Sequence, residues 1–190
     1  MHARVIRYQV KPGQTAERVR HAREGKGAAL KQAPGLKRRV ILVDPQSHKQ
    51  LTIALFETEA DMDAIGNSAQ YQPAFGRHEH AAGDASRETF EVAHQEGGPG
   101  KLARVVTLQI KPGKVEDRLG QVRSLDRIPG RSGLWSLVDR ASHKNLTISF
   151  WDSEDAMHAF EREQGTQAGV AHHQHADDVV LEHFEVGHSD

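Results

Sequence analysis

The feature that most limits what this chain can fold into is an internal repeat. Residues 3–13 read ARVIRYQVKPG and residues 103–113 read ARVVTLQIKPG, with seven of eleven positions identical. Residues 42–65 return at 137–160 with 12 of 24 positions identical, and FEVAH at 90–94 returns as FEVGH at 184–188. Three matched blocks in one order indicate that a whole folding unit was duplicated.

A polar, glycine-rich segment separates the two copies. Residues 95–100 read QEGGPG, a composition typical of a flexible connector. The sequence therefore predicts two domains, residues 1–96 and residues 97–190.

Each copy predicts the order strand, helix, strand, strand, helix, strand. Apolar residues alternate with polar ones before each Lys-Pro-Gly, helix formers follow at 14–32 and 115–126, and a polar turn that contains Ser-His-Lys joins two short apolar runs. Thr58 and Ser153, each followed by acidic residues, predict the N-caps of the second helices. The closing strands are predicted at 89–92 and 181–186.

Composition excludes several classes of protein. The 190 residues carry a formal net charge of -1 and no cysteine, which argues against general nucleic-acid binding and excludes disulfides and thiolate-bound metals. No apolar run approaches the roughly 20 residues that a membrane helix needs, and the N-terminus lacks the apolar core of a signal peptide. We expect a soluble, cytoplasmic protein with no nucleic-acid or membrane partner.

The βαββαβ order is ferredoxin-like, and further details resemble the antibiotic biosynthesis monooxygenase family. These details are the strand that ends in Lys-Pro-Gly, the Pro-Gly before the hairpin, an aromatic residue closing the third strand (Phe56 or Trp151), and the Thr/Ser-Glu start of the next helix. The resemblance implies an α+β protein in which two tandem ferredoxin-like units form a dimeric α/β barrel within one chain. Such a pseudo-dimer leaves open whether copies of the chain associate further.

The third strand of each copy has two distinct faces. We expect Leu51, Ile53 and Leu55 to face the helices, with Phe56 on the opposite face. Phe56 and its counterpart Trp151 would then lie in the core between two sheets, or else form one wall of a ligand cavity.

The resemblance also implies a site after the second helix. In cofactor-independent members of the family, polar residues there help to bind an aromatic substrate whose own carbanion activates oxygen. Asn67 and Tyr71 are the catalytic residues carried over, and Phe56, Phe75 and Trp151 are the substrate-binding candidates. The second copy keeps neither the Asn nor the Tyr, so an amphipathic helix end with a packed Tyr is the competing interpretation.

The 13 histidines raise the alternative of a metal or haem site. An H-x-H pair occurs as His78 and His80 and recurs as His173 and His175, but no third ligand is spaced with either pair, so these are weak metal candidates. Haem-degrading relatives carry a Trp and an axial His where this chain has Ile65 and Phe75. We therefore expect no cofactor. The function that the resemblance implies is monooxygenation of a small, largely apolar or aromatic molecule; a non-catalytic ligand-binding or structural module, or a metal- or haem-binding protein, is the alternative.

Overall fold

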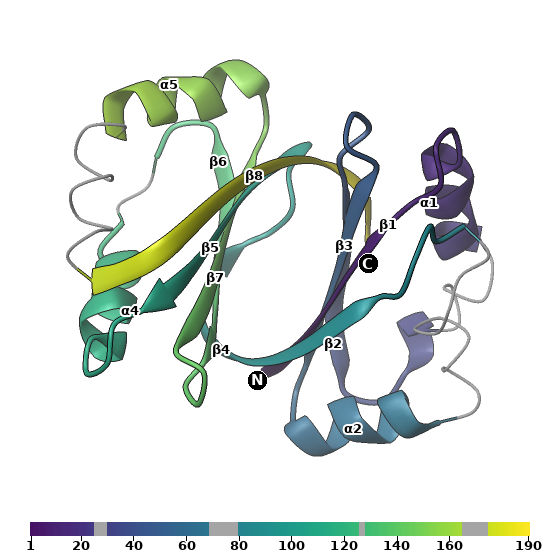
Figure 1. Ribbon diagram of the computed structural model, residues 1–190, viewed down its shortest axis with the longest axis horizontal. Helices are drawn as coiled ribbons and strands as arrows, with labels where there is room; N and C mark the ends of the chain where they lie inside the picture. The colour runs from purple at the N-terminus through teal and green to yellow at the C-terminus, as the bar shows by residue number, and fades with distance from the viewer. Residues whose placement is uncertain (25–29, 69–79, 126–127, 165–174) are drawn as a thin grey trace. The chain divides into compact units, whose positions relative to one another are not determined.

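The structure is a computed structural model that describes residues 1–24, 30–68, 80–125, 128–164 and 175–190 (Figure 1). The described elements follow the predicted order twice. The first series is β1 (His2–Gln9), α1 (Thr15–Glu24), β2 (Leu36–Val43), β3 (Lys49–Phe56), α2 (Glu59–Asn67) and β4 (Ser86–Gly97). The second series is β5 (Leu102–Ile110), α4 (Val115–Arg123), β6 (Arg131–Asp139), β7 (Lys144–Trp151), α5 (Glu154–Gln164) and β8 (Ala176–Ser189). The predicted α+β, ferredoxin-like order of elements is thereby confirmed.

The chain divides into two compact units, one made of Met1–Phe90 with Glu185–Asp190 and the other of Glu91–Phe184. In the first unit the strand order is β4-β1-β3-β2-β8, and in the second it is β8-β5-β7-β6-β4. The closing strands β4 and β8 are longer than predicted and contribute to both units. The part of β4 from Glu91 onward pairs antiparallel with β6, and the part of β8 from Glu185 onward pairs antiparallel with β2. The domain boundary at 96/97 remains a prediction about where the duplicated sequence divides.

In each unit the helices lie on one face of the sheet (Figure 1). In the first unit this face carries Phe56, which packs with Met62 and Ile65 of α2. The expected orientation of β3 is therefore wrong: Leu51, Ile53 and Leu55 point to the face without helices. Alternation decides which residues share a face, but both faces of β3 are buried, so hydrophobicity could not indicate which one meets the helices. Phe56 and Trp151 consequently do not belong to a core between two sheets.

The local signals for turns and caps are confirmed. The Thr58 hydroxyl accepts a hydrogen bond from the Asp61 amide at 3.1 Å, and Ser153 accepts one from the Ala156 amide at 3.3 Å, so each caps its helix. In both hairpin turns the histidine, His48 or His143, has a φ of 58°. Its carbonyl accepts a hydrogen bond from the end of the first strand at 2.8 Å in each unit. These two histidines therefore have a structural place in the turn.

Within the described ranges, no helix has both the length and the apolar character that crossing a membrane requires.

Candidate active site

The structure describes only some of the residues predicted for a site in the first unit. Asn67 is the last residue of α2 and is exposed, whereas Phe56 is fully buried among the side chains of the same unit. Tyr71 and Phe75 lie outside the described residues. The structure therefore does not bring Asn67 into the buried cluster that holds Phe56, and the predicted pairing of Asn67 with Tyr71 stays a prediction.

Only one histidine of each predicted pair is described, because His78 and His173 lie outside the described residues. His80 is buried, its Nδ1 lies 3.0 Å from the Gln14 side-chain oxygen, and its carbonyl accepts a hydrogen bond from the Lys11 amide at 2.8 Å. The carbonyl of His175 accepts the equivalent bond from Lys111 at 2.9 Å. Across the described ranges, no three His, Cys, Asp or Glu side chains converge in a way that could hold a metal ion.

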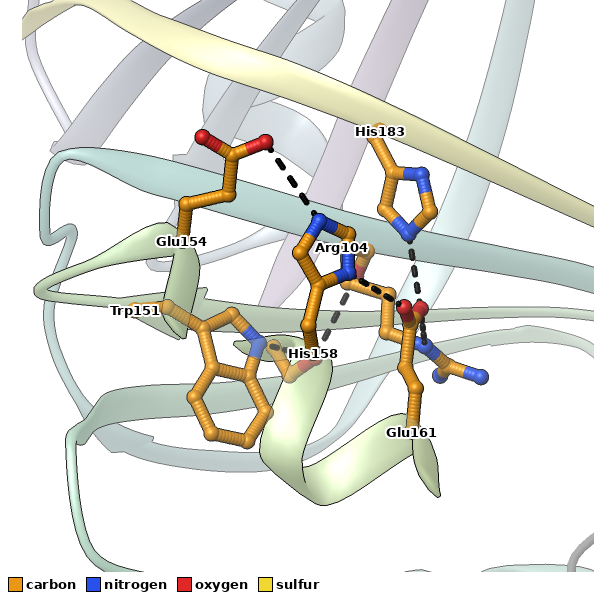
Figure 2. Close-up of polar contacts among 7 residues, drawn as sticks. Arg104, Trp151, Glu154, His158, Glu161 and His183 are labelled. Atoms are coloured by element: carbon orange, nitrogen blue, oxygen red, sulfur yellow. Dashed lines mark hydrogen bonds and ion pairs between the residues drawn. The ribbon is translucent and has the colours of Figure 1, made fainter. Parts of the chain in front are cut away.

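The second unit holds an extended polar network beside the Trp151 ring (Figure 2). We call it the α5 cluster, and it consists of Arg104, Ser149, Trp151, His158, Phe160, Glu161 and His183. The Trp151 ring is fully buried, lies 5.1 Å from the Phe160 ring between centroids, and donates its indole N–H to the Ser149 hydroxyl at 3.0 Å. The Arg104 guanidinium lies over the same Phe160 ring at 5.7 Å. Trp151 therefore packs against α5.

Glu161 is the centre of the network. Its carboxylate accepts a hydrogen bond from Arg104 Nε at 3.0 Å and lies 2.7 Å from His183 Nε2, which comes from β8. Its second oxygen lies 3.1 Å from Nδ1 of His158, one turn earlier on α5. The other nitrogen of His158 lies 3.4 Å from Glu154. One carboxylate thus orients two imidazoles that come from different elements (Figure 2).

The contacts within this network shift the pKa values of Glu161 and His158 in opposite directions. Burial alone would raise the pKa of Glu161, but its hydrogen bonds to His183, His158 and Arg104 outweigh burial and lower the pKa below its ordinary value. The same bond to Glu161, followed by the bond to Glu154, raises the pKa of His158. Glu161 is therefore a carboxylate at neutral pH, and an imidazole held by a carboxylate is the arrangement that general bases use.

The first unit lacks this network. Arg4 occupies the position of Arg104 and pairs with Asp63 of α2 at 3.4 Å. Gly66 stands where the second copy has Glu161, and a Cβ added there would lie 2.2 Å from the Arg4 guanidinium. The ion pair between the first strand and the second helix thus recurs, whereas the carboxylate that holds two histidines belongs to the second unit alone among the described residues.

A second buried polar group lies under the first helix of each unit. Arg18 on α1 and Arg118 on α4 are buried, and both point toward the sheet. Neither arginine was singled out from the sequence. A signal was present, because Arg118 stands with Val115, Leu119 and Val122 at the spacing of an apolar helix stripe. Apart from Trp151, the members of the α5 cluster had no comparable signal, since their contacts join four separate elements, β5, β7, α5 and β8.

Comparison with known protein families finds a match for the first repeat. Residues 1–77 match the sequence profile of the antibiotic biosynthesis monooxygenase family. No curated protein matches the chain in sequence.

Solved structures share the fold over the full chain. A candidate monooxygenase from Fusobacterium nucleatum superposes with a TM-score of 0.77 at 10% identity, covering 100% of this chain and 93% of that one. An anthrone oxidase-like protein gives 0.67 at 15% identity, covering 100% and 92%. A heme-degrading enzyme from Listeria monocytogenes gives 0.57 at 10% identity, covering 98% and 99%. At these identities the likeness is one of fold.

Proposed function

We propose that the chain, whose residues 1–77 match the profile of the antibiotic biosynthesis monooxygenase family, oxidises a small, largely apolar aromatic molecule with O2 and without a bound cofactor. The observation that carries the proposal is the α5 cluster of the second unit. It combines an aromatic surface, Trp151 and Phe160, with an imidazole, His183, that is oriented by a carboxylate.

The chemistry follows from these side chains. When Nε2 of His183 donates to Glu161, the other ring nitrogen carries a lone pair and can accept a proton from an acidic C–H group of the substrate. The resulting carbanion, delocalised into the aromatic system, supplies the electrons to O2. Oxidation of a CH2 group to C=O then balances as CH2 plus O2 giving C=O plus H2O. Arg104 supports this step by keeping Glu161 ionised, so that the carboxylate stabilises the imidazolium that forms.

The aromatic surface sets the substrate class. Trp151 packs against Phe160, and a site that borders such rings would favour a flat apolar molecule. One solved structure with this fold is called anthrone oxidase-like. Anthrone is flat and aromatic, and its single CH2 group loses a proton readily, so it is the first substrate to test.

The experiment measures O2 consumption with anthrone by the purified full-length chain. His183→Gln removes the proton acceptor and should lower turnover by about 10²–10⁴-fold, the usual contribution of a positioned base. The repeat offers a matched pair of controls: Arg104→Gln should lower turnover, while Arg4→Gln, the same change in the first unit, should not. Unchanged turnover in His183→Gln would remove the α5 cluster from the reaction.

The predicted site in the first unit is the alternative location. Loss of turnover in Tyr71→Phe together with full activity in His183→Gln would move the site to the first unit. Binding of anthrone with no O2 consumption would instead support a non-catalytic ligand-binding module. The close packing of Phe56 and the exposure of Asn67 favour a structural role for the described part of the first unit.

A further inference from the structure

Arg118 is a buried cation whose hydrogen bonds are incomplete. Its side chain leaves α4 toward the sheet and is only 7% exposed. Nη2 donates to the Thr147 hydroxyl at 3.5 Å, the long limit of a hydrogen bond. Nε is buried and has no hydrogen-bond partner among the described residues. No carboxylate among the described residues forms an ion pair with this guanidinium.

The first unit provides the contrast. Arg18, 100 residues earlier, is 4% exposed and donates from Nε to the hydroxyl of Tyr8. The guanidinium also lies 5.7 Å from the centre of the Tyr8 ring. In the second copy Leu108 replaces Tyr8, so the group that satisfies Nε in the first unit is missing. The same buried arginine thus has an internal partner in one unit and lacks it in the other.

The uncharged polar side chains beside Arg118 are hydrogen-bonded to one another and to the backbone. Thr147 donates to the Asn145 side-chain oxygen at 3.1 Å. The Asn145 amide donates to the Ser136 hydroxyl at 3.0 Å and to the Leu137 carbonyl at 2.7 Å. Around them lies an apolar cluster that includes Val106, Leu108, Ile110, Leu119 and Val138. Among the described residues, the Nε–H of Arg118 is therefore left without an acceptor.

The charge of Arg118 persists in this environment. Burial, and next to it the positive charge of Arg104, lowers the pKa of Arg118 to about 10, which still leaves the guanidinium protonated at neutral pH. Arg104 is itself neutralised by Glu161, while Arg118 has no such partner among the described residues. A buried charge without a counter-ion is costly, and an anion at this position would remove that cost.

We propose that Arg118, with Thr147 beside it, is a binding site for the carboxylate of a small ligand that has an apolar body. The Nε and Nη2 edge of a guanidinium presents two parallel N–H groups, which match the two oxygens of a carboxylate. The aliphatic side chains of Val106, Leu108 and Leu119 suit the apolar part of such a ligand. This site lies under α4, involves none of the hydrogen bonds of the α5 cluster, and stands whether or not that cluster is catalytic.

The test is titration of the full-length chain with benzoate by isothermal titration calorimetry, with acetate as the carboxylate that lacks an apolar body. Benzoate should bind more tightly than acetate. Arg118→Met should weaken benzoate binding by about tenfold or more, the effect of losing a charge-assisted hydrogen bond. Arg18→Met, the same change in the first unit, should leave benzoate binding unchanged.

A second variant tests whether the unpartnered Nε of Arg118 is what binds the carboxylate. Leu108→Tyr places in the second unit the hydroxyl that satisfies Arg18 in the first, keeps the charge of Arg118, and should weaken benzoate binding by about tenfold. Circular dichroism of each variant checks that it is folded. Absence of benzoate binding to the natural chain, or equal binding by folded Arg118→Met, would overturn the proposal. Loss of benzoate binding in Arg118→Met with anthrone turnover retained would separate this site from the oxygenation.

Discussion

Replacing Asp190 by Asn is predicted to destabilise the first unit strongly. The Asp190 carboxylate accepts hydrogen bonds from the Arg39 guanidinium, with Nε at 2.7 Å, and from Lys31 at 2.8 Å. His188 lies 2.8 Å from the same carboxylate. Arg39 is 2% exposed and Asp190 8% exposed at the side chain, whereas Lys31 is 50% exposed. The pair of Arg39 and Asp190 is therefore a buried one, and Lys31 is a partner at its rim.

The magnitude follows from which charge is left behind. Asn keeps the shape of Asp and one accepting oxygen, but removes the side-chain charge that pairs with the buried Arg39 guanidinium. Breaking a buried pair in this way costs about 3–5 kcal/mol, and we expect about 3 kcal/mol because one oxygen remains to accept. For a chain of this size that corresponds to a fall in Tm of roughly 6–12 °C. Lys31→Ala removes only the exposed partner and should cost no more than about 1 kcal/mol.

Urea unfolding followed by far-ultraviolet circular dichroism measures both variants. A double-mutant cycle of Asp190→Asn with Arg39→Met isolates the pair itself, and the double variant should be more stable than the sum of the single changes predicts. If Asp190→Asn costs no more than Lys31→Ala, the reasoning fails, because the two side chains would then not form a buried pair in solution.

The same carboxylate predicts a dependence on pH. Burial alone would raise the pKa of Asp190, but the hydrogen bond from Lys31 and the charge of Arg39 outweigh it and hold the pKa below its ordinary 3.8. The folded-state pKa is therefore the lower one. The stabilisation is complete above the unfolded-state pKa and is lost as the pH falls through the folded-state pKa. Asp190→Asn should lack this acid-sensitive part of the stability.

Three further changes test the packing. Arg118→Met replaces an uncompensated buried charge with an apolar side chain and should stabilise the chain by about 1–4 kcal/mol in urea unfolding; a lower midpoint would show that the charge is compensated. Phe56→Ala removes a fully buried ring and should cost about 3–5 kcal/mol in the same assay, while a cost below about 1 kcal/mol would mean that the ring is not part of a packed core. Thr58→Ala removes the cap of α2 and should cost about 1 kcal/mol in thermal unfolding, whereas Thr58→Ser, which keeps the hydroxyl, should be nearly neutral.

Much of the fold was predictable because its signals are local. The helix cap at Thr58 and the alternation in the first strand each depend on a few neighbouring residues, and the structure confirms them. The repeat strengthened these predictions, since each signal occurs a second time in the same order. The lengths of β4 and β8 were underestimated, because their ends are polar, as in the QEG that closes β4, and give no apolar alternation to read.

The candidate site was less predictable because its contacts are not local. Glu161, Arg104 and His183 come from α5, β5 and β8, and nothing near any of them in sequence indicates the other two. Trp151 was identified as an aromatic residue of interest, but the face it occupies was misjudged, since both faces of its strand are buried.

The sequence by itself determined the duplicated βαββαβ order, the caps and the turns, because periodicity and hydrogen bonds between near neighbours specify these features. Only the tertiary structure decided which sheet face lies beneath the helices, which strands pair with the two halves of β4 and β8, and which arginine has an Nε without a hydrogen-bond partner among the described residues. Strand pairing and burial depend on hydrogen bonds and packing between residues far apart in the chain. The sequence shows that Tyr8 in one copy corresponds to Leu108 in the other. Only the structure shows that Tyr8 accepts a hydrogen bond from Arg18 and that Leu108 cannot do so for Arg118.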